Sequence, residues 1–347
     1  MDTRELQGLR YRCLEDCGYC CTFTPEVSGP ELAKLRTRLP QLPVVRAGEM
    51  LLLPFQGACG ACTLLKDRRC TVYEDRPAHC RYFPFHVYFG RRTEAYVNRC
   101  CRGVEVAPGG HLEVEFKAQV LDRATPQRLA KDQARADSVH RMFERAARES
   151  GMWGDVDREV AALLRRGPSW FRPATWPATP LEVQDEAGSP GEAWQMALAP
   201  FSVPDPVARP FHLTAELQWL GFEGAAEGIQ TQTLTEDGRL APLRPLGTFP
   251  DWPTLPNEVQ GGLFDIMRRL AGRDLLAGSI YYMVDDTGYE VSIADAASIR
   301  LGDIAADLAI RADILHRMGT PWPLVPAEVD RFYDSAFLDT PTIGGWL

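Results

Sequence analysis

Apolar residues recur at helical spacing along much of the second half of the chain. Thr125 and Asp155 precede two such segments, and both residue types accept hydrogen bonds from the free N–H groups at a helix start. We therefore predict helices over residues 125–151, 155–167, 257–271, 303–318 and 326–337. A shorter helix is predicted after Ser28, because Ser28 and Glu31 have the spacing of a capping box and Pro40 would end the helix.

Apolar residues that alternate with polar ones, or that form short runs between turn residues, indicate strands. We predict strands over residues 85–89, 94–97, 112–116, 193–198, 212–220, 228–234, 279–284 and 289–293. Residues 85–89 and 94–97 are expected to form one hairpin, and 279–284 and 289–293 another across the turn residues 285–288. Because strands and helices do not alternate regularly, the pattern predicts an α+β fold.

The cysteines divide the chain into two unequal parts. All ten lie within the first 101 residues of the 347: Cys13, Cys17, Cys20, Cys21, Cys59, Cys62, Cys70, Cys80, Cys100 and Cys101. From this asymmetry we predict a small cysteine-rich metal-binding domain over residues 1–120. A helical connector over 121–167 and a loop-rich α+β body over 168–347, of unknown role, are expected to follow.

Charge follows the same division. Residues 1–101 hold 15 basic and 11 acidic residues, whereas the remainder holds 23 and 36, so the body is acidic. An acidic body argues against a nucleic-acid partner, and no apolar run approaches the ~20 residues of a membrane span. The polar start lacks the basic and then apolar pattern of a secretion signal, so we expect a cytoplasmic protein. A protein partner remains open, and the sequence does not fix the oligomeric state.

In a reducing cytosol, clustered cysteines bind metal or do redox work more often than they form disulfides. The first cluster has the spacing C-x3-C-x2-C-C over Cys13 to Cys21, and the second begins with the pair Cys59 and Cys62. Gly18 and Gly60 lie inside these turns and permit backbone conformations that a side chain would forbid. We expect thiolates on such turns to point at one centre.

The cysteine pattern is compatible with two kinds of metal centre, a zinc ion or an Fe–S cluster. A structural zinc ion takes four tetrahedral ligands, whereas each Fe–S cluster takes four thiolates and ten cysteines could hold one or two clusters. We favour an Fe–S cluster because the thiols outnumber the ligands of one zinc site, with zinc as the alternative. Arg76 and Arg81 are predicted to be cofactor-binding residues that donate hydrogen bonds to ligand sulfurs or carbonyls. His79 is a further candidate ligand beside Cys80.

Residues 10–105 resemble the CxxCxxCC or YkgJ-type family, described as a zinc- or iron-chelating domain. The resemblance rests on Cys13-x3-Cys17-Gly-x-Cys20-Cys21, on Cys62-x-Leu64 and on the string from Cys70, Cys-Thr-Val-Tyr-Glu-Asp-Arg-Pro-x2-Cys-Arg-x-Phe-Pro-Phe. It implies chelation through Cys17, Cys20, Cys21, Cys62, Cys70 and Cys80, with Cys13 and Cys100 as additions. Cys59 and Cys101 lie outside the family pattern and stay candidate ligands from the cysteine count alone.

Flagellin lysine-N-methylases are similar in the same cysteine motif, so a lysine-N-methylase-like enzyme is one alternative. Cys13-x3-Cys17-x-Tyr-Cys20 also resembles the radical-SAM cluster motif, but the body lacks the repeated βα units that such enzymes need. We therefore expect a metal-binding protein with a redox, sensing or cluster-dependent modification role. A structural zinc module that binds a partner is the other alternative, and no catalytic residue is identified.

Overall fold

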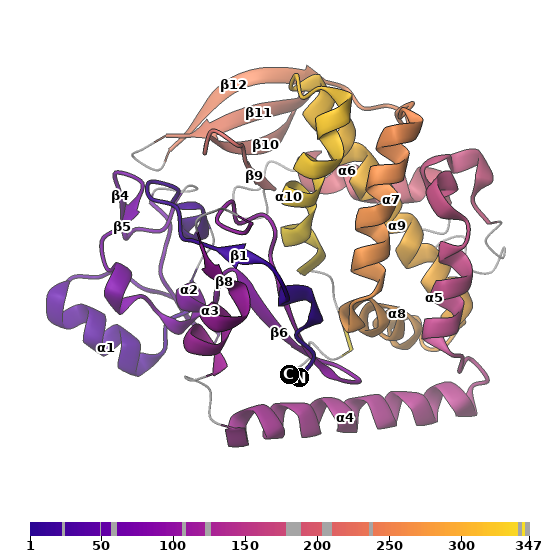
Figure 1. The fold of residues 1–347 in the computed structure, drawn as a ribbon, viewed down its shortest axis with the longest axis horizontal. Helices are drawn as coiled ribbons and strands as arrows, with labels where there is room; N and C mark the ends of the chain where they lie inside the picture. Colours follow the sequence, from indigo (N-terminus) through magenta and orange to yellow (C-terminus); the bar gives the residue numbers. More distant parts are fainter. Residues whose placement is uncertain are drawn as a thin grey trace.

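The structure is a computed structural model that describes residues 1–22, 25–48, 50–56, 61–105, 109–121, 126–177, 189–202, 210–235, 239–338 and 342–343. Figure 1 shows a cysteine-bearing part built from short elements on one side and a helical part on the other. We call residues 1–121 the head and residues 126–343 the body. Separate small sheets and many helices make the fold α+β, as the sequence predicts.

The head is built from two-stranded sheets, short helices and turns. Its helices are η1 (Arg4–Leu6), η2 (Tyr19–Cys21), α1 (Gly29–Arg38), η3 (Tyr73–Asp75), α2 (Ala78–Tyr82) and α3 (Leu112–Gln119). Its strands are β1 (Arg10–Tyr11), β2 (Val45–Ala47), β3 (Met50–Leu52), β4 (Leu65–Lys66), β5 (Arg69–Cys70), β6 (Phe85–Phe89), β7 (Thr93–Val97) and β8 (Gly110–His111). The strands pair as β1 with β8, β2 with β3, β4 with β5 and β6 with β7.

The body combines one four-stranded sheet with long helices. Its helices are α4 (Pro126–Glu149), α5 (Val156–Leu164), η5 (Gly167–Phe171), η6 (Pro173–Thr175), α6 (Pro190–Ser202), α7 (Asn257–Ala271), α8 (Asp274–Asp286), α9 (Ile293–Arg317), η8 (Trp322–Leu324) and α10 (Val325–Leu338). Strands β9 (Phe211–Leu213), β10 (Trp219–Ala225), β11 (Gly228–Leu234) and β12 (Leu240–Gly247) lie in the order β12-β11-β10-β9. All of these neighbours pair antiparallel.

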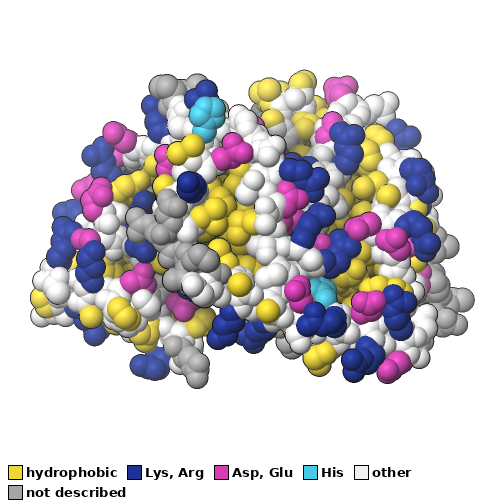
Figure 2. Space-filling model, turned by 60° about the horizontal axis from the view of Figure 1, so that its bottom comes forward, with side chains coloured by type: hydrophobic (Ala, Val, Ile, Leu, Met, Phe, Trp, Pro, Cys, Tyr) yellow, Lys and Arg dark blue, Asp and Glu magenta, His cyan; other side chains and the backbone are white. Residues whose placement is uncertain are grey.

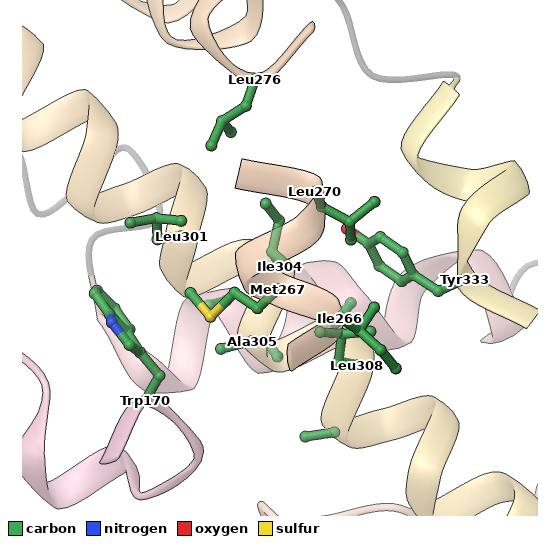
Figure 3. Packing of buried hydrophobic residues seen from close by; sticks show 14 of the residues in the cluster. Trp170, Ile266, Met267, Leu270, Leu276, Leu301, Ile304, Ala305, Leu308 and Tyr333 are labelled. Carbon is green, nitrogen blue, oxygen red and sulfur yellow. The ribbon is translucent and has the colours of Figure 1, made fainter. Parts of the chain in front are cut away.

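The main hydrophobic core lies between the helices of the body. Figure 3 shows Met267 of α7, Ile304 of α9 and Tyr333 of α10 in the same buried cluster, with the Tyr333 ring beside Leu270. Helix α9 is buried along most of its length and contacts α5, α6, α7, α8 and α10. Burial of this many apolar side chains makes α9 the central element of the body.

Head and body share hydrophobic clusters. Leu213, Trp219 and Leu234 of the sheet β9–β12 pack in the same cluster as the cysteine loops of the head. Tyr88 and Tyr96 of the head hairpin belong to the main core of the body. Helix α4 runs below both parts in Figure 1 and contacts β6 and α8. The cysteine-rich region is therefore packed against the body rather than joined to it only by a linker.

Several sequence predictions are confirmed. The capping box at Ser28 and Glu31 starts α1, and Asp155 caps α5 by accepting from the backbone N–H of Arg158. The hairpin of β6 and β7, strand β11 and helix α7 lie where the pattern places them. Helix α4 begins at residue 126 as expected, although Thr125 lies outside the described residues.

Three strand predictions are wrong because the residues form helices. Residues 112–116 are helical: Leu112 and Phe116 are buried four residues apart on one face of α3, whereas Val114 is exposed. Residues 193–198 belong to α6, whose start carries an overlooked capping pair of Ser189 and Glu192. Residues 279–284 lie in α8, which is buried on nearly all sides, so no helical period shows.

The remaining differences are one further absent strand and several shifted boundaries. Residues 289–293 form no strand, because Ser292 caps α9, which begins ten residues before the predicted start at residue 303. Residues 212–220 are two strands, β9 and the start of β10, separated by a turn in which Leu217 has a φ of 60°. Helix α10 lies at the predicted 326–337 to within one residue at each end.

None of the helices in the described ranges has the length and apolarity that a membrane span requires. On the face drawn in Figure 2, basic and acidic side chains lie interspersed, and no field of a single sign covers it.

Candidate metal centre

Five thiols line one small cavity in the head. They belong to Cys20, Cys21, Cys62, Cys70 and Cys80, and the cavity has a volume of about 30 Å³. The remaining lining residues are mainly apolar: Pro25, Leu53, Leu64, Val72, Tyr73, Arg76 and Pro77. Four separate segments of the chain therefore bring thiols to one place.

Gly18 sets the conformation of the first cysteine loop. It has a φ of 59°, the left-handed region that favours glycine, and it precedes the short helix η2 that carries Cys20 and Cys21. A Cβ atom at this position would lie 2.7 Å from the Trp219 ring and 3.0 Å from Leu65. Both the backbone conformation and the close packing therefore require glycine here.

The second cysteine cluster is joined to the first by backbone hydrogen bonds. The N–H of Cys62 donates to the carbonyl of Cys21 at 2.7 Å. Cys70 pairs with Leu65 in the β4–β5 hairpin, and the Gln56 amide donates to the carbonyls of Cys62 and Leu65. These bonds hold three of the cavity thiols in a fixed relation to one another.

Cys80 enters the cavity from helix α2. Pro77 precedes this helix, and the backbone N–H of Ala78 donates to Glu31 Oε1 at 2.7 Å. Glu31 also accepts from Ser28 in the capping box of α1, so one carboxylate connects the starts of both helices. The position of Cys80 thus depends on α1.

The body also holds the first cysteine loop. Trp219 Nε1 donates to the carbonyl of Cys17 at 2.8 Å, and the Tyr19 hydroxyl donates to the carbonyl of Phe211 at 3.1 Å. The Arg68 guanidinium lies 4.9 Å from the centre of the Trp219 ring. Sheet residues about 200 positions away therefore form one wall around the cysteine loops.

The thiols of the cavity differ in acidity. Hydrogen bonding of Cys21 with Cys20 and Cys70 raises the pKa of Cys21 and lowers the pKa values of the other two thiols, that of Cys70 to about 7. Burial raises the pKa of Cys62 to about 11 and also raises that of Cys80. Cys20 and Cys70 are therefore the thiols that ionise first, and a thiolate is the form that binds metal.

The two predicted arginines occupy different places. Arg76 lines the cavity, lies 3.8 Å from the centre of the Tyr73 ring and lowers the pKa values of Cys20 and Cys70 through its charge. Arg81 is not among the lining residues; it donates to the carbonyl of Arg76 and pairs with Glu31 at 3.6 Å. A direct role of either arginine in binding a cofactor stays a prediction.

Four other predicted ligands, Cys13, Cys17, Cys100 and Cys101, are not among the described residues that line the cavity. Cys13 is exposed, Cys17 is half-buried, and Cys100 and Cys101 are buried. Cys59 lies outside the described residues. Hydrogen bonding joins Cys13 to Tyr73, and Cys101 lies within electrostatic range of Cys13, Cys17 and Cys20. His79 does not line the cavity.

As the thiols stand, they surround the cavity without meeting at a point. Among the described residues, no group of three His, Cys, Asp or Glu side chains has the arrangement that holds a metal ion. Soft thiolates around an apolar cavity nevertheless have the donor chemistry of zinc and of Fe–S clusters. The donor set fits such a group, and binding would deprotonate the thiols.

Sequence reasoning missed two contributors to this site. Tyr73 belongs to the family string but had no assigned role, and it forms part of the cavity wall. Trp219 lies far along the chain, in a strand of the body, and no spacing pattern connects it with the cysteines. Only the three-dimensional packing of the sheet on the head identifies it.

Comparison with known proteins agrees with the cysteine pattern. Residues 12–102 match the CxxCxxCC family, described as "Putative zinc- or iron-chelating domain". An uncharacterized protein of Methanocaldococcus jannaschii is 31% identical over 126 residues, which cover 32% of this chain and 68% of that protein. No solved structure matches the chain. The head therefore carries the metal-chelating domain that this family model describes, and the chain belongs to the CxxCxxCC family.

Proposed function

We propose that the head holds a thiolate-bound metal centre in the cavity of Cys20, Cys21, Cys62, Cys70 and Cys80, and that this centre is an Fe–S cluster with a redox or sensing role. The observation that supports it is the gathering of five thiols from four segments around one apolar cavity. No histidine or carboxylate is among the described residues that line it, so its ligands are all soft sulfur donors.

The number and acidity of the thiols favour a cluster. A closed zinc site needs four ligands, and five thiols already exceed that number before the cysteines outside the cavity are counted. The lowered pKa values of Cys20 and Cys70 favour their thiolate forms, and the nearby charge of Arg76 offsets the negative charge of a thiolate-bound cluster.

A redox role fits the depth of the cavity. Tyr73 lines the cavity and has 43% of its surface exposed, so the wall of the cavity reaches the surface at this side chain. A centre that lies close to the surface can exchange electrons with a docked protein or respond to oxidants in solution. We therefore place redox exchange at the face that carries Tyr73 and the exposed Cys13.

One observation favours a second candidate, a structural zinc ion in a module that binds a partner. A volume of about 30 Å³ corresponds to roughly two water-sized spheres, which suits one ion better than a cluster. A cluster would require the cysteine loops to open. Metal analysis distinguishes the two candidates, because only a cluster contains iron and inorganic sulfide.

The ligand assignment is tested by Cys70→Ala, Cys21→Ala and the double variant, purified without oxygen beside the wild type. We expect the double variant to keep less than about a tenth of the wild-type metal, since at most three of the five thiols remain. Cys101→Ala is the matched control: its thiol is buried in the same domain but does not line the cavity. The proposal fails if the double variant retains the wild-type metal content.

A further inference from the structure

A second, larger cavity lies where the head meets the body. Its volume is about 420 Å³, in the range of small-molecule sites. It is lined by residues of the chain start, of strand β7 and of the corner between α7 and α8: Asp2, Arg4, Glu5, Gln7, Leu9, Glu94, Ala95, Tyr96, Arg99, Arg269, Gly272 and Arg273. Four of these residues are arginines, and three carry carboxylates.

Arg273 gives this cavity a rigid basic group. Only 4% of its surface is exposed, and its guanidinium lies 4.4 Å from the centre of the Tyr96 ring. It immediately precedes α8, so its position is fixed by the corner that joins two core helices. A guanidinium held this firmly loses little freedom when it binds a ligand, which favours recognition over a flexible surface contact.

Arg269 and Arg273 both bind the carboxylate of Glu5. Glu5 Oε2 accepts from Arg273 Nε at 2.8 Å, and Glu5 Oε1 accepts from Arg273 Nη2 and from Arg269 Nη1, the latter at 3.4 Å. The two guanidiniums therefore present a fork that fits the oxygens of a carboxylate or a phosphate. Glu5 lies in the three-residue helix η1, whose backbone is anchored by the fully buried Leu6.

The other two carboxylates of the lining have different partners. Glu94 Oε1 accepts from the backbone N–H of Leu275 at the start of α8, and Asp2 is bound to Arg4 at 2.6 Å. Asp330, which does not line the cavity, pairs with Arg269 and Arg99. Among the described carboxylates of the lining, Glu5 is the one that hydrogen-bonds to Arg269 and Arg273.

We propose that this cavity binds a small molecule through an oxyanion, either a phosphate or a carboxylate, which replaces the Glu5 carboxylate on Arg269 and Arg273. Without a ligand, the Glu5 carboxylate occupies the oxyanion position on the two guanidiniums. When the ligand binds, Glu5 leaves this position by a change of side-chain rotamer. The remaining volume of the cavity accommodates the rest of the molecule, with Tyr96 and Leu9 as its apolar walls. This site is separate from the cysteine cavity and does not depend on the metal.

The test measures thermal unfolding and calorimetric binding of the full chain with inorganic phosphate and with succinate, each against chloride at equal ionic strength. We expect a saturable rise in Tm with at least one of the two, and the one that acts identifies the oxyanion. Glu5→Gln should bind the same anion several-fold more tightly, because the internal competitor is gone. Arg269→Gln should bind it about tenfold more weakly.

Arg268→Gln is the matched control, because Arg268 is the neighbour of Arg269 on α7 but pairs with Asp265 and does not line the cavity. Its affinity should equal that of the wild type. If Arg269→Gln fails to fold, Arg4→Gln replaces it: this lining side chain is 72% exposed and pairs with Asp2, and its loss should weaken binding several-fold. The proposal is overturned if neither anion acts beyond chloride, or if Glu5→Gln leaves the affinity unchanged.

Discussion

At the scale of single residues, the cysteine loop depends on a position where only glycine fits. Gly18 needs both a left-handed backbone and room for the Trp219 ring. The first requirement could be predicted from the sequence, since a glycine stands between two closely spaced cysteines. The second could not, because Trp219 comes from a strand about 200 residues later and only tertiary packing brings it there.

We expect Gly18→Ala to lower the free energy of unfolding by about 3 kcal/mol or more, through backbone strain together with the clash against Trp219. Gly8→Ala is the control: Gly8 has a φ of 74°, but a Cβ atom there meets nothing within 4 Å, so only about 1 kcal/mol of strain is expected. Urea unfolding of both variants measures the difference. Equal losses would contradict the packing argument.

Glu328 is a second residue whose environment determines its behaviour. Burial alone would raise its pKa, but hydrogen bonds from His212 and Arg102 and the charge of Arg102 lower the pKa to about 2. Arg102 belongs to the head and Glu328 to α10, so this carboxylate bonds the two parts together. No sequence pattern predicts this contact, because Arg102, His212 and Glu328 are far apart along the chain.

The lowered pKa of Glu328 means that its contribution to stability is present above the unfolded value of 4.5 and is lost as the pH falls toward about 2. We expect Glu328→Gln to cost about 2 kcal/mol at pH 7 and to lose less further stability than the wild type between pH 4.5 and pH 3. Urea midpoints of both proteins at the three pH values test this. Parallel pH profiles would show that the ion pair does not contribute as described.

At the scale of elements, helix caps and turns could be predicted from the sequence, whereas several strand predictions are wrong. Capping residues at Ser28 and Asp155 act locally, so the sequence alone identifies them. The apolar residues of 112–116 alternate with polar ones and so predicted a strand, but residues four apart also share one face of a helix. Helix α8 is buried on nearly all sides, so its sequence shows no helical period of apolar residues. The contact of β10 with the cysteine loop is the element-level feature that matters most for the site.

We expect Trp219→Phe to speed metal release from the chain several-fold and to lower stability by about 1–2 kcal/mol, since the bond to the Cys17 carbonyl is lost. Trp194→Phe is the matched control, because Trp194 Nε1 makes a similar bond to the Phe249 carbonyl inside the body, away from the cysteines. Release is measured by transfer of the metal to a chelator. Equal release rates in the two variants would show that the sheet does not support the cysteine loop.

At the scale of the whole molecule, the α+β class and the cysteine-rich head could be predicted, but the way the parts pack could not. The predicted division at residues 120 and 167 follows composition, and it stays a prediction. Head residues Tyr88 and Tyr96 lie in the main core, and the Arg273–Glu5 ion pair crosses the junction. Such contacts join residues distant in sequence, and composition does not encode them.

This shared packing has a thermodynamic consequence. Because sheet residues of the body share a hydrophobic cluster with the cysteine loops, we expect removal of the metal to lower the Tm of the whole chain in a single transition. Calorimetry of the protein before and after chelator treatment tests this. A separate low-temperature transition confined to the head, with an unchanged main transition, would contradict it.

The central claim is that thiols around the first cavity hold a metal centre, and that this centre is an Fe–S cluster. Iron, zinc and acid-labile sulfide analysis of the full chain purified without oxygen, with its visible spectrum before and after reduction, tests it most directly. We expect iron and sulfide in similar amounts and a broad visible absorption that bleaches on reduction. A colourless protein with one zinc per chain would contradict the cluster, and a protein without bound metal would contradict the centre itself.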